Sequence, residues 1–415
     1  MKRFFEKFIH EIQIEKFTNN ANGKKIIIWG ANLDGKSLYE LLINKNQFVY
    51  AFIDEKASEI NFEFGGIKIE LPEFLKGNEE NYYVFVAKAY KKEIENFLIE
   101  NNYMEVSDYL YILHETHEIE KDEEYVDIYG NKIKGIKGTK INFMGYNSIL
   151  NIGSECNWGE KTKLCSTNSS IIMGSESSIG KDSTIECNNS DINIGFRSSI
   201  GKESKIQCSN SSIIVGCESS IEKENIIQCN NSSIIIGSEI LIKKDNKIEC
   251  SNSIISIDSN CSIGKDSKIT CKNNSSLMIG ENCVFGSINF FISDNSGKVE
   301  IGKDCMVSQL VTISNNDGHP IFDIHANKQI NMNGSIIIGS HVWLGTKCTI
   351  MSGSEIGDGS IVGANSLVKN KFPNNCTIAG IPAKLKNKDI AWDREQRNPC
   401  LINNKTYWNK TIEDK

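Results

Sequence analysis

The chain has 415 residues, which is long enough for two domains with sizeable hydrophobic cores, and it carries a formal net charge of −7. This modestly acidic balance gives no sign of a nucleic-acid partner. No apolar run approaches the roughly 20 residues that a membrane-spanning helix needs, so no membrane span is expected. Acidic residues interrupt the first twenty positions, so we expect no signal peptide and a cytoplasmic protein.

Residues 1–23 predict a short amphipathic helix. Its apolar residues share one face at helical spacing, namely Phe5, Phe8, Ile9 and Ile12. We expect this face to pack on the protein's own body, and docking at a membrane surface is the alternative.

Residues 24–114 alternate between strand and helix patterns and predict a small α/β domain. The unbroken apolar run 25–29 is typical of a buried parallel strand. A glycine-containing turn, 30–35, leads into a helix over 36–44, and a second strand covers 49–53. Strand, turn, helix and strand in this order make half of a dinucleotide-binding unit.

Two positions decide how closely this unit follows the dinucleotide-binding pattern. Asp54 is the acid that tips the second strand, as the pattern requires. Asn32 occupies the place of the second glycine, which weakens the approach to a phosphate. A strand over 82–86, a helix over 91–101 and a last strand within 104–111 complete the domain.

The domain resembles the small Rossmann-like domains that are fused to polysaccharide-biosynthesis enzymes. In some N-acetyltransferases of nucleotide-linked amino sugars, such a domain holds the nucleotide sugar, and the resemblance implies this role as one reading. A docking or oligomerisation domain with an empty crevice is the other reading. Acidic residues then dominate 115–126, which we expect to be a linker.

From Gly145 onward the sequence repeats, and a repeat outranks local patterns. One column of residues that keeps a step of 21 consists of Cys187, Cys208, Cys229, Cys250 and Cys271. Within one repeat the apolar residues follow at steps of six, six and nine, as in Met173, Ile179, Ile185 and Ile194. The longest step holds three extra residues rich in Asn and Ser, and Asn tolerates the left-handed backbone that a sharp corner requires.

One repeat is therefore one coil of a parallel β-helix, in which coils stack at the strand-pairing distance of about 4.8 Å. The sequence predicts a mainly β protein with an N-terminal α/β domain. The β-helix covers 127–388, with 21-residue coils over 152–271 and hexapeptide coils over 280–370. Residues 389–415 form a C-terminal tail.

The chain contains 14 Cys, which would suggest disulfides in a short secreted protein. The cysteines of the 21-residue column instead point to the same side as the core isoleucines, two residues on. Five stacked thiols cannot all pair, and the coil spacing lies outside disulfide geometry. We expect buried free thiols, and no metal site because no short C-x-x-C pair occurs among them.

A polar loop, 314–337, interrupts the six-residue ladder of apolar residues that runs from Ile301 to Val368. The loop contains His319, which is a candidate general base. Neutral imidazole takes a proton from a hydroxyl group at neutral pH, and a hydroxyl is otherwise a poor nucleophile. Asp317 and Asp323 are both candidates to orient the imidazole.

Three motifs follow one another in this region: Asp317-Gly318-His319-Pro320, Ile338-Gly339-Ser340-His341-Val342-Trp343-Leu344-Gly345 and Gly380-Ile381-Pro382-Ala383-Lys384. With them, residues 280–395 resemble the hexapeptide-repeat acyltransferases, and within that superfamily the O-acetyltransferases of sialic acid and bacterial capsular polysaccharides. The resemblance implies a left-handed β-helix and a homotrimer. It also implies that acetyl-CoA binds at the seam between subunits.

The resemblance further implies roles for single residues. His319 matches the family's catalytic histidine, and Trp343 matches the tryptophan that packs by the reacting groups. Gly363 and Ala364 match the small residues beside which the pantetheine arm runs. Lys384 matches the family's lysine near the CoA phosphates.

Other positions follow from the chemistry that the reaction needs. The CoA phosphates need cations, and the lysines that fall within 20 residues are Lys369, Lys371, Lys384, Lys386 and Lys388. Backbone N–H groups near Gly345 are candidate donors to an oxyanion, because glycine permits close approach. His341 is either structural or a second candidate base.

The leading hypothesis is an acetyl-CoA-dependent O-acetyltransferase that acts on a sugar of a surface glycan. An N-acetyltransferase of a nucleotide-linked amino sugar is the second enzymatic hypothesis. A non-catalytic β-helical scaffold or glycan-binding protein belongs to a different class. The added 21-residue coils either hold the N-terminal domain at a distance or bind a long glycan.

Overall fold

The computed structural model describes most of the chain. The described residues are 21, 23–44, 46–60, 66–88, 92–104, 108–111, 117–119, 122–126, 131–137, 140–141, 143–146, 148–208, 212–229, 231, 233–270, 274–291, 297–332, 334–394 and 405–412. The helix predicted over residues 1–23 lies outside them, apart from Ala21 and Gly23. The chain forms two compact units, the smaller made of 1–118, 126–131 and 142–146 and the larger of 119–125, 132–141 and 147–415.

The smaller unit contains a five-stranded sheet in the order β3-β2-β1-β4-β5. All four strand pairs of this sheet are parallel. Its elements are β1 Lys25–Trp29, α3 Leu33–Asn44, β2 Val49–Ile53, the short helices η1 Ala57–Glu59 and η2 Pro72–Leu75, β3 Ile69–Glu70, β4 Tyr82–Val86, α4 Lys92–Glu100 and β5 Tyr109–Tyr111. The predicted strands over 25–29, 49–53 and 82–86 are confirmed, and α3 begins at Leu33, three residues before the predicted start.

The two helices cover opposite faces of this sheet. Leu38 and Leu42 of α3 pack with Ile28 and Phe52 on one face. Residues of α4 pack on the other face with Ile27 and Val84. A sheet that is buried on both faces explains why β1 and β4 read as unbroken apolar runs.

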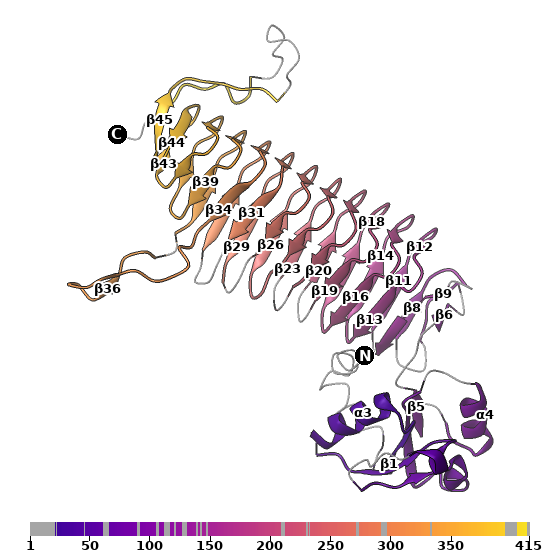
Figure 1. The fold of residues 1–415 in the computed structure, drawn as a ribbon. Coiled ribbons are helices and arrows are strands. Elements are labelled where there is room, and N and C mark those ends of the chain that lie inside the picture. Colours follow the sequence, from indigo (N-terminus) through magenta and orange to yellow (C-terminus); the bar gives the residue numbers. More distant parts are fainter. Residues whose placement is uncertain are drawn as a thin grey trace. The chain divides into compact units, whose positions relative to one another are not determined.

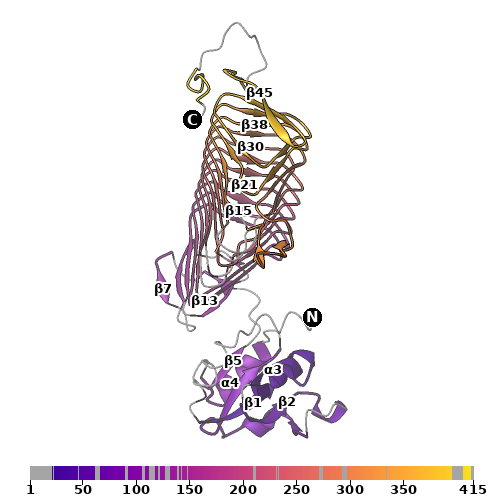
Figure 2. The same ribbon diagram turned by 90° about the vertical axis from the view of Figure 1, so that its left-hand side faces the viewer.

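The larger unit is a parallel β-helix, and Figures 1 and 2 show its coils stacked one above another. It has three sheets of 13, 11 and 12 strands. The 13-stranded sheet consists of β7 Tyr125–Val126, β8 Lys132–Lys134, β11 Ile149–Ile152, β14 Ser170–Met173, β17 Asp191–Ile194, β20 Ser212–Val215, β23 Ser233–Ile236, β26 Ile254–Ile257, β29 Ser276–Ile279, β32 Lys298–Ile301, β37 Ile336–Ile338, β40 Glu355–Ile356 and β43 Lys371–Phe372. The stretch expected to be a linker, 115–126, therefore ends in the outermost strand of this sheet.

The other two sheets repeat the same arrangement. The 11-stranded sheet consists of β10 Phe143–Tyr146, β13 Lys163–Thr167, β16 Thr184–Asn188, β19 Lys205–Gln207, β22 Ile226–Ile227, β25 Lys247–Ile248, β28 Lys268–Ile269, β31 Ile288–Phe291, β34 Val311–Ser314, β39 Thr349–Met351 and β42 Leu367–Val368. The 12-stranded sheet, which faces the viewer in Figure 2, consists of β12 Asn157–Trp158, β15 Ser178–Ile179, β18 Ser199–Ile200, β21 Ser220–Ile221, β24 Leu241–Ile242, β27 Ser262–Ile263, β30 Val284–Phe285, β33 Met306–Val307, β38 Trp343–Leu344, β41 Ile361–Val362, β44 Thr377–Gly380 and β45 Ala383–Asn387. A small sheet pairs β6 His117–Glu118 with β9 Lys140–Ile141.

The core of the β-helix is a set of in-register columns of aliphatic side chains. Ile171, Ile192 and Ile213 follow one another in the 13-stranded sheet, and none is more than 1% exposed. Burying each such side chain stabilises the fold by about 1.5–3 kcal/mol. Cys187, Cys208, Cys229 and Cys250 are buried free thiols, as the repeat predicts. Cys271 lies outside the described residues.

The corners between sheets are left-handed turns, as predicted for the Asn-rich corner. Asn189 has a φ of 49° and Asn231 has a φ of 58°. Beside the corners, glycine is required by the stacking itself. A Cβ on Gly180 would lie 2.4 Å from the backbone nitrogen of Lys202 in the next coil. The spacing of the glycines thus records the contact between coils.

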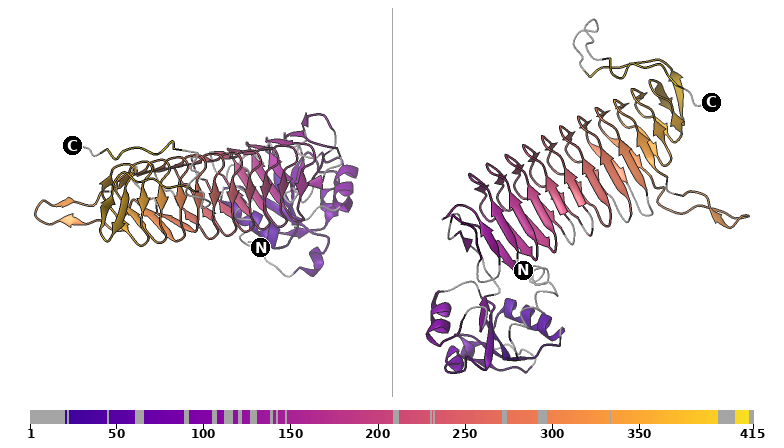
Figure 3. Two further views of the ribbon diagram at one scale, coloured as in Figure 1. Left: turned by 90° about the horizontal axis from the view of Figure 1, so that it is seen from above. Right: turned by 180° about the vertical axis from the view of Figure 1, so that it is seen from behind.

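Two segments depart from the regular coils. The arm, residues 315–332, follows β34 and contains an antiparallel hairpin of β35 Phe322–Asp323 and β36 Lys328–Gln329. Figures 1 and 3 show that it extends away from the coils. The C-terminal strap, residues 388–394 and 405–412, lies against the last coils, where Asn375 Nδ2 donates to the Ile390 and Tyr407 carbonyl oxygens at 3.0 and 2.6 Å.

Candidate functional site

His319 lies on the exposed surface of the arm, three residues before the hairpin begins. Its carbonyl oxygen accepts a hydrogen bond from Asn331 Nδ2 at 2.8 Å. Among the described residues, no hydrogen bond of the His319 imidazole is found. The side chain is exposed and can meet a ligand.

The two aspartates that were candidates to orient His319 have other partners. Asp317 Oδ2 accepts from Asn331 Nδ2 at 3.1 Å. Asp323 Oδ1 accepts the backbone N–H groups of His325 and Ala326 at 2.8 and 2.9 Å, and these bonds lower the pKa of its carboxyl. Asp323 therefore shapes the hairpin turn, whereas Asp317 ties the His319 segment to the returning chain.

Trp343 opens β38 and points outward from the 12-stranded sheet, while Leu344 points into the core. Its indole Nε1 donates to Ser308 Oγ at 3.2 Å. His319 and Trp343 belong to different parts of the coil, because the arm leaves from the 11-stranded sheet. No contact joins the two residues within the described structure.

The candidate CoA-binding glycines behave differently from each other. Gly345 is buried, its N–H donates to the Val362 carbonyl at 2.8 Å, and a Cβ there would lie 2.7 Å from the Ala364 nitrogen. Stacking therefore explains the glycine at 345, and its N–H is not a free oxyanion donor. At Gly363 a Cβ would meet only the Ala379 Cβ closely, at 3.1 Å.

Two of the predicted lysines, Lys369 and Lys384, lie in different parts of the β-helix. Lys384 is exposed on β45, opposite Ala379 of β44, and so lies beside the Gly363 column. Lys369 is exposed directly after β42, at the corner of the 11-stranded sheet from which the arm also leaves. The structure thus brings Gly363, Ala364 and Lys384 together and leaves Lys369 on the side of His319.

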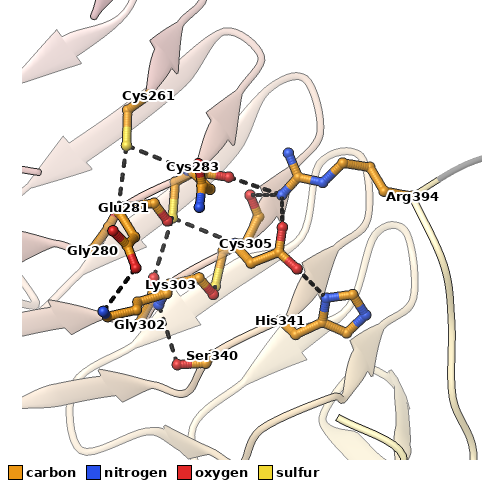
Figure 4. Close-up of polar contacts among 12 residues, drawn as sticks. Cys261, Gly280, Glu281, Cys283, Gly302, Lys303, Cys305, Ser340, His341 and Arg394 are labelled. Atoms are coloured by element: carbon orange, nitrogen blue, oxygen red, sulfur yellow. Dashed lines mark hydrogen bonds and ion pairs between the residues drawn. The ribbon is translucent and has the colours of Figure 1, made fainter. Parts of the chain in front are cut away.

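His341 is part of a polar cluster that the sequence did not reveal (Figure 4). Its Nδ1 lies 2.6 Å from Asp304 Oδ2, and Arg394 Nη2 pairs with the other oxygen of Asp304 at 2.8 Å. Trp392 and Tyr407 stack on the two sides of the imidazole, with ring centroids 4.1 and 4.7 Å away. Residues this far apart in the sequence carry no local pattern that would group them.

The N-terminal unit has its own polar cluster at the carboxyl ends of its strands. Asp54 Oδ2 accepts the Ala31 N–H at 3.0 Å and pairs with Lys88 Nζ at 3.0 Å, while Oδ1 accepts the Lys56 N–H at 3.1 Å. Burial alone raises the pKa of Asp54, but these three donors outweigh it, so the pKa lies below its usual value. The acid of the dinucleotide-binding pattern is therefore engaged by its own domain.

Asn32, which replaces the second glycine of that pattern, has a structural task. Its Oδ1 accepts the Gly35 N–H at 2.8 Å, which caps the first turn of α3. Its Nδ2 donates to the Ala87 carbonyl at 3.1 Å and ties the turn to the end of β4. The substitution thus stabilises the turn, which the glycine pattern alone does not indicate.

A cleft of about 670 Å³ lies between the last strands of the 13-stranded sheet and the strap. Ile337, Phe372 and Lys410 are among its lining residues, and none of the predicted site residues is. Among the described residues, no group of three His, Cys, Asp or Glu side chains is placed to hold a metal ion. In the same part of the chain, no helix combines the length and apolar character needed to cross a bilayer.

Two family models match separate parts of the chain. Residues 335–370 match the family described as bacterial transferase hexapeptide (six repeats). Residues 22–109 match the family described as C2185-like, N-terminal. The first match covers the coils that carry Trp343, Gly345 and Gly363, and the second covers the α/β unit.

Three known proteins are similar to this chain. A polysialic acid O-acetyltransferase of Escherichia coli O1:K1 / APEC is 36% identical over 100 residues, which are 24% of this chain and 33% of that protein. A putative lipopolysaccharide biosynthesis O-acetyl transferase of Escherichia coli (strain K12) is 48% identical over 54 residues, which are 13% of this chain and 28% of that protein. The crystal structure of the polysialic-acid-specific acetyltransferase NeuO aligns at 26% identity and a TM-score of 0.39, covering 54% of this chain and 84% of that one.

The chain thus spans about a third of the length of the curated relatives that it matches. Three findings agree. Hexapeptide coils follow the arm, a family model matches these coils, and similar proteins are named O-acetyltransferases. The β-helix is mainly parallel strands in stacked coils, as such repeats require. On these grounds, the coils over 335–370 are similar to the bacterial hexapeptide transferases, and stretches of the chain are similar to O-acetyltransferases.

Proposed function

We propose that this chain is an O-acetyltransferase that moves acetyl from acetyl-CoA to a sugar hydroxyl of a surface glycan. The observation that carries the proposal is the imidazole of His319, which is exposed on an arm that precedes the hexapeptide coils. The relatives named as acting on polysialic acid and in lipopolysaccharide biosynthesis support a glycan acceptor. Sialic acid and a capsular or lipo-oligosaccharide sugar are the acceptors we favour.

In the proposed reaction, His319 acts as general base. Its neutral imidazole takes the proton of the sugar hydroxyl as the hydroxyl oxygen bonds to the thioester carbonyl carbon. The carbon–sulfur bond then breaks, and the protonated imidazole returns the proton to the sulfur of CoA. The products are an O-acetyl sugar and CoA-SH, so no oxidant, reductant or metal enters the balance.

The acyl donor has two requirements. Its pantetheine arm needs a narrow path, and its phosphates need cations nearby. Gly363 and Ala364 leave open space on the outside of their coil, since Ala364 is exposed and Gly363 is half-buried. Lys384 supplies a cation beside them, and Lys369 supplies one at the corner of the arm. Use of acetyl-CoA as donor also favours a cytoplasmic location.

The arm supports a site that forms between subunits. Its apolar side chains are exposed, with values of 51% for Ile321, 55% for Phe322, 85% for Ile324 and 63% for Ile330. Such side chains favour burial, and their exposure here indicates that another surface covers them. We propose that a second copy of the chain covers them and brings its Trp343 near His319.

The outer face of the 13-stranded sheet offers a further contact surface between copies. Ile214, Ile235 and Met278 are exposed there, at 38%, 38% and 45%. Ile214 and Ile235 are register partners on neighbouring strands, so the apolar column is continuous at that point. We therefore propose a homotrimer with its sites at the seams, and light scattering at micromolar concentration is the first test.

Subunit complementation tests where the site lies. The inactive variants His319→Ala and Trp343→Ala are mixed in equal amounts, denatured together and refolded. If each site takes His319 and Trp343 from different chains, random trimers regain about a quarter of wild-type sites. No recovery of activity places both residues in one chain and contradicts the seam.

Release of CoA thiol with a panel of acceptors tests the function itself. Polysialic acid, free sialic acid and a UDP-linked amino sugar are compared with water as acceptor. O-acetylation of a sialic acid supports the proposal, whereas turnover confined to the UDP-amino sugar supports an N-acetyltransferase. A protein that releases no thiol with any acceptor is a scaffold or a glycan-binding protein.

The N-terminal unit is the observation that favours the N-acetyltransferase alternative. Its parallel sheet carries Asp54 at the end of β2, where a ribose hydroxyl binds in dinucleotide-binding folds. The full engagement of Asp54 by Ala31, Lys56 and Lys88 counts against an open nucleotide site. We therefore propose a docking role for this unit, which binding of UDP-sugars in calorimetry would contradict.

A further inference from the structure

One edge of the β-helix carries a column of left-handed corner residues, and the C-terminal strap lies along its last part. This edge joins the 13-stranded to the 12-stranded sheet. The corner residues near the strap have positive φ angles and are Asn282, Asp304, His341, Gly359 and Asn375. Each N–H donates to the coil before it, as His341 N does to the Lys303 carbonyl at 2.7 Å.

The strap binds this column residue by residue. Arg394 Nη2 donates to the Asn282 carbonyl at 2.9 Å, besides its ion pair with Asp304. The Tyr407 carbonyl faces Gly359, where a Cβ would lie 3.0 Å from its oxygen. Glycine at this corner therefore makes room for the strap, whereas the other corners carry side chains.

His341 stands at the centre of the contact. Its Nε2 lies 3.0 Å from the Trp392 carbonyl oxygen, and the Trp392 indole Nε1 donates to the His341 carbonyl at 2.8 Å. The Nδ1 faces the Asp304 carboxylate. Both atoms that face the ring nitrogens are acceptors, so a ring nitrogen that carries a proton donates to one of them.

These contacts leave His341 no free nitrogen with which to accept a proton from a substrate. The ring is also enclosed by Trp392 and Tyr407, which lie nearly parallel to it at interplanar angles of 13° and 3°. His341 is therefore built as a clasp for the strap and not as a second general base.

The clasp places Trp392 beside Trp343. The two indole centroids are 6.0 Å apart at an interplanar angle of 45°, within the range of favourable aromatic pairs. Trp392 is only 8% exposed, so its position is fixed by the contacts around it. A ligand that binds at the outer face of Trp343 thus meets a surface that also includes Trp392 of the strap.

We propose that the C-terminal strap is one wall of the acetyl-transfer site, and that His341 is a positioning residue that holds Trp392 against Trp343. This inference rests on the proposed acetyltransferase function. It gives the strap a task in substrate binding and leaves the proton transfer to His319. Loss of the clasp should therefore weaken substrate binding more than it slows the chemical step.

His341→Asn tests the clasp, because Asn tolerates the left-handed corner but lacks the aromatic ring. Hydrogen exchange of the peptide that contains Trp392 should accelerate in this variant, since the strap is released. The KM for acetyl-CoA or for the acceptor should rise about tenfold while kcat changes less. Glu239→Asn, at an exposed left-handed corner outside the strap, is the matched control and should change neither.

Substitutions of Trp392 separate packing from the mere presence of the strap. Trp392→Ala should raise KM as His341→Asn does, and Trp392→Phe should restore part of the affinity because an aromatic ring still packs on His341. If His341→Asn frees the strap but leaves KM and kcat at wild-type values, the strap is not part of the site. If it lowers kcat as far as His319→Ala without changing exchange, His341 is the base and the proposal is wrong.

The failure of the proposed function would look different. If the wild-type protein transfers no acetyl group to any acceptor, the proposed function is wrong. The proposal that the strap is a wall of the acetyl-transfer site is then wrong as well. The exchange measurement needs no turnover, so it still decides whether His341 holds the strap. Unchanged exchange in both His341→Asn and Trp392→Ala would overturn the positioning role by itself.

Discussion

The Asn331 side chain joins the two strands of the arm at His319: its Nδ2 donates to the His319 carbonyl at 2.8 Å. The same amide reaches Asp317, and its Oδ1 accepts the Ile321 N–H at 2.6 Å. One side chain thus fixes the backbone on both sides of the candidate base. The position of His319 depends on a residue twelve places further along the chain.

Asn331→Ala should loosen the arm without unfolding the coils. Each lost hydrogen bond is worth about 1 kcal/mol, and the arm buries few side chains. We expect kcat to fall, by less than in His319→Ala, and the amide of Ile321 to exchange faster. An unchanged kcat together with faster exchange would show that catalysis does not depend on the arm's shape.

His319→Ala should lower kcat by roughly 10²–10⁴-fold, the range for loss of a positioned base. Binding of acetyl-CoA should stay near wild type, because Gly363, Ala364 and Lys384 are unchanged. The melting temperature should also stay, since His319 is exposed. His325→Ala removes another exposed imidazole of the same arm and is the control. Retention of more than about a tenth of kcat would contradict a general-base role.

Gly345→Ala and Gly363→Ala should separate coil stacking from ligand binding. A Cβ at 345 would press on the next coil's backbone at 2.6–2.7 Å, so we expect a loss of about 1–3 kcal/mol in the free energy of unfolding. Gly363→Ala meets a methyl group at 3.1 Å and should cost less. Calorimetric titration with acetyl-CoA gives the affinity of each variant. Relative to its loss of stability, Gly363→Ala should lose more affinity for acetyl-CoA than Gly345→Ala. Equal losses would indicate that pantetheine does not pass Gly363.

Alkylation of the native protein should distinguish the described cysteines by exposure. Cys217 is exposed, whereas Cys348 is buried and burial raises its pKa to about 12. A thiol with that pKa stays protonated between pH 7 and 9, so it is a poor nucleophile even when reached. Peptide mapping after iodoacetamide treatment should find Cys217 modified and Cys348 intact. Rapid labelling of Cys348 would mean that its coil opens.

Asp54→Asn should destabilise the N-terminal unit in a pH-dependent way. The carboxylate has a lowered pKa, so its contribution is present at neutral pH and is lost as the pH falls through that pKa. At pH 7 we expect a loss of about 2 kcal/mol, because a charged acceptor of three donors disappears. Once the pH lies below that lowered pKa, wild type and variant should converge in denaturant titrations. A constant difference across this range would indicate that packing, and not charge, is responsible.

The sequence predicted the β-helix well because each coil repeats the same contacts. The isoleucines of one core column are register partners, so a single spacing in the chain reports a single spacing in space. The prediction of strands over 25–29 and 82–86 succeeded for a similar reason, since sheets buried on both faces need unbroken apolar runs. The Asn-rich corners followed from backbone sterics alone.

The site was less predictable because its residues meet across long separations. His341 could be marked as ambiguous, but its partners Trp392 and Tyr407 come from a segment that has no repeat. Gly345 looked like a ligand-facing glycine, whereas its neighbour in the stack explains it. Asn32 looked like a defect, although its side chain caps α3. Periodicity reveals the contacts that every coil repeats. The contacts of these residues occur once in the protein, so no repeat in the sequence reports them.

The in-register corners make the length of the solenoid adjustable in whole steps. Ser170 and Asp191 are register partners, as are Asp191 and Ser212, and each pair is one repeat apart. Removing the 21 residues from 191 to 211 would join coils whose register, core and corners already match. The protein would shorten by about one strand spacing of 4.8 Å and keep its catalytic coils unchanged. Chains of this kind can therefore gain or lose reach by duplication or deletion of single coils, without redesign of the fold.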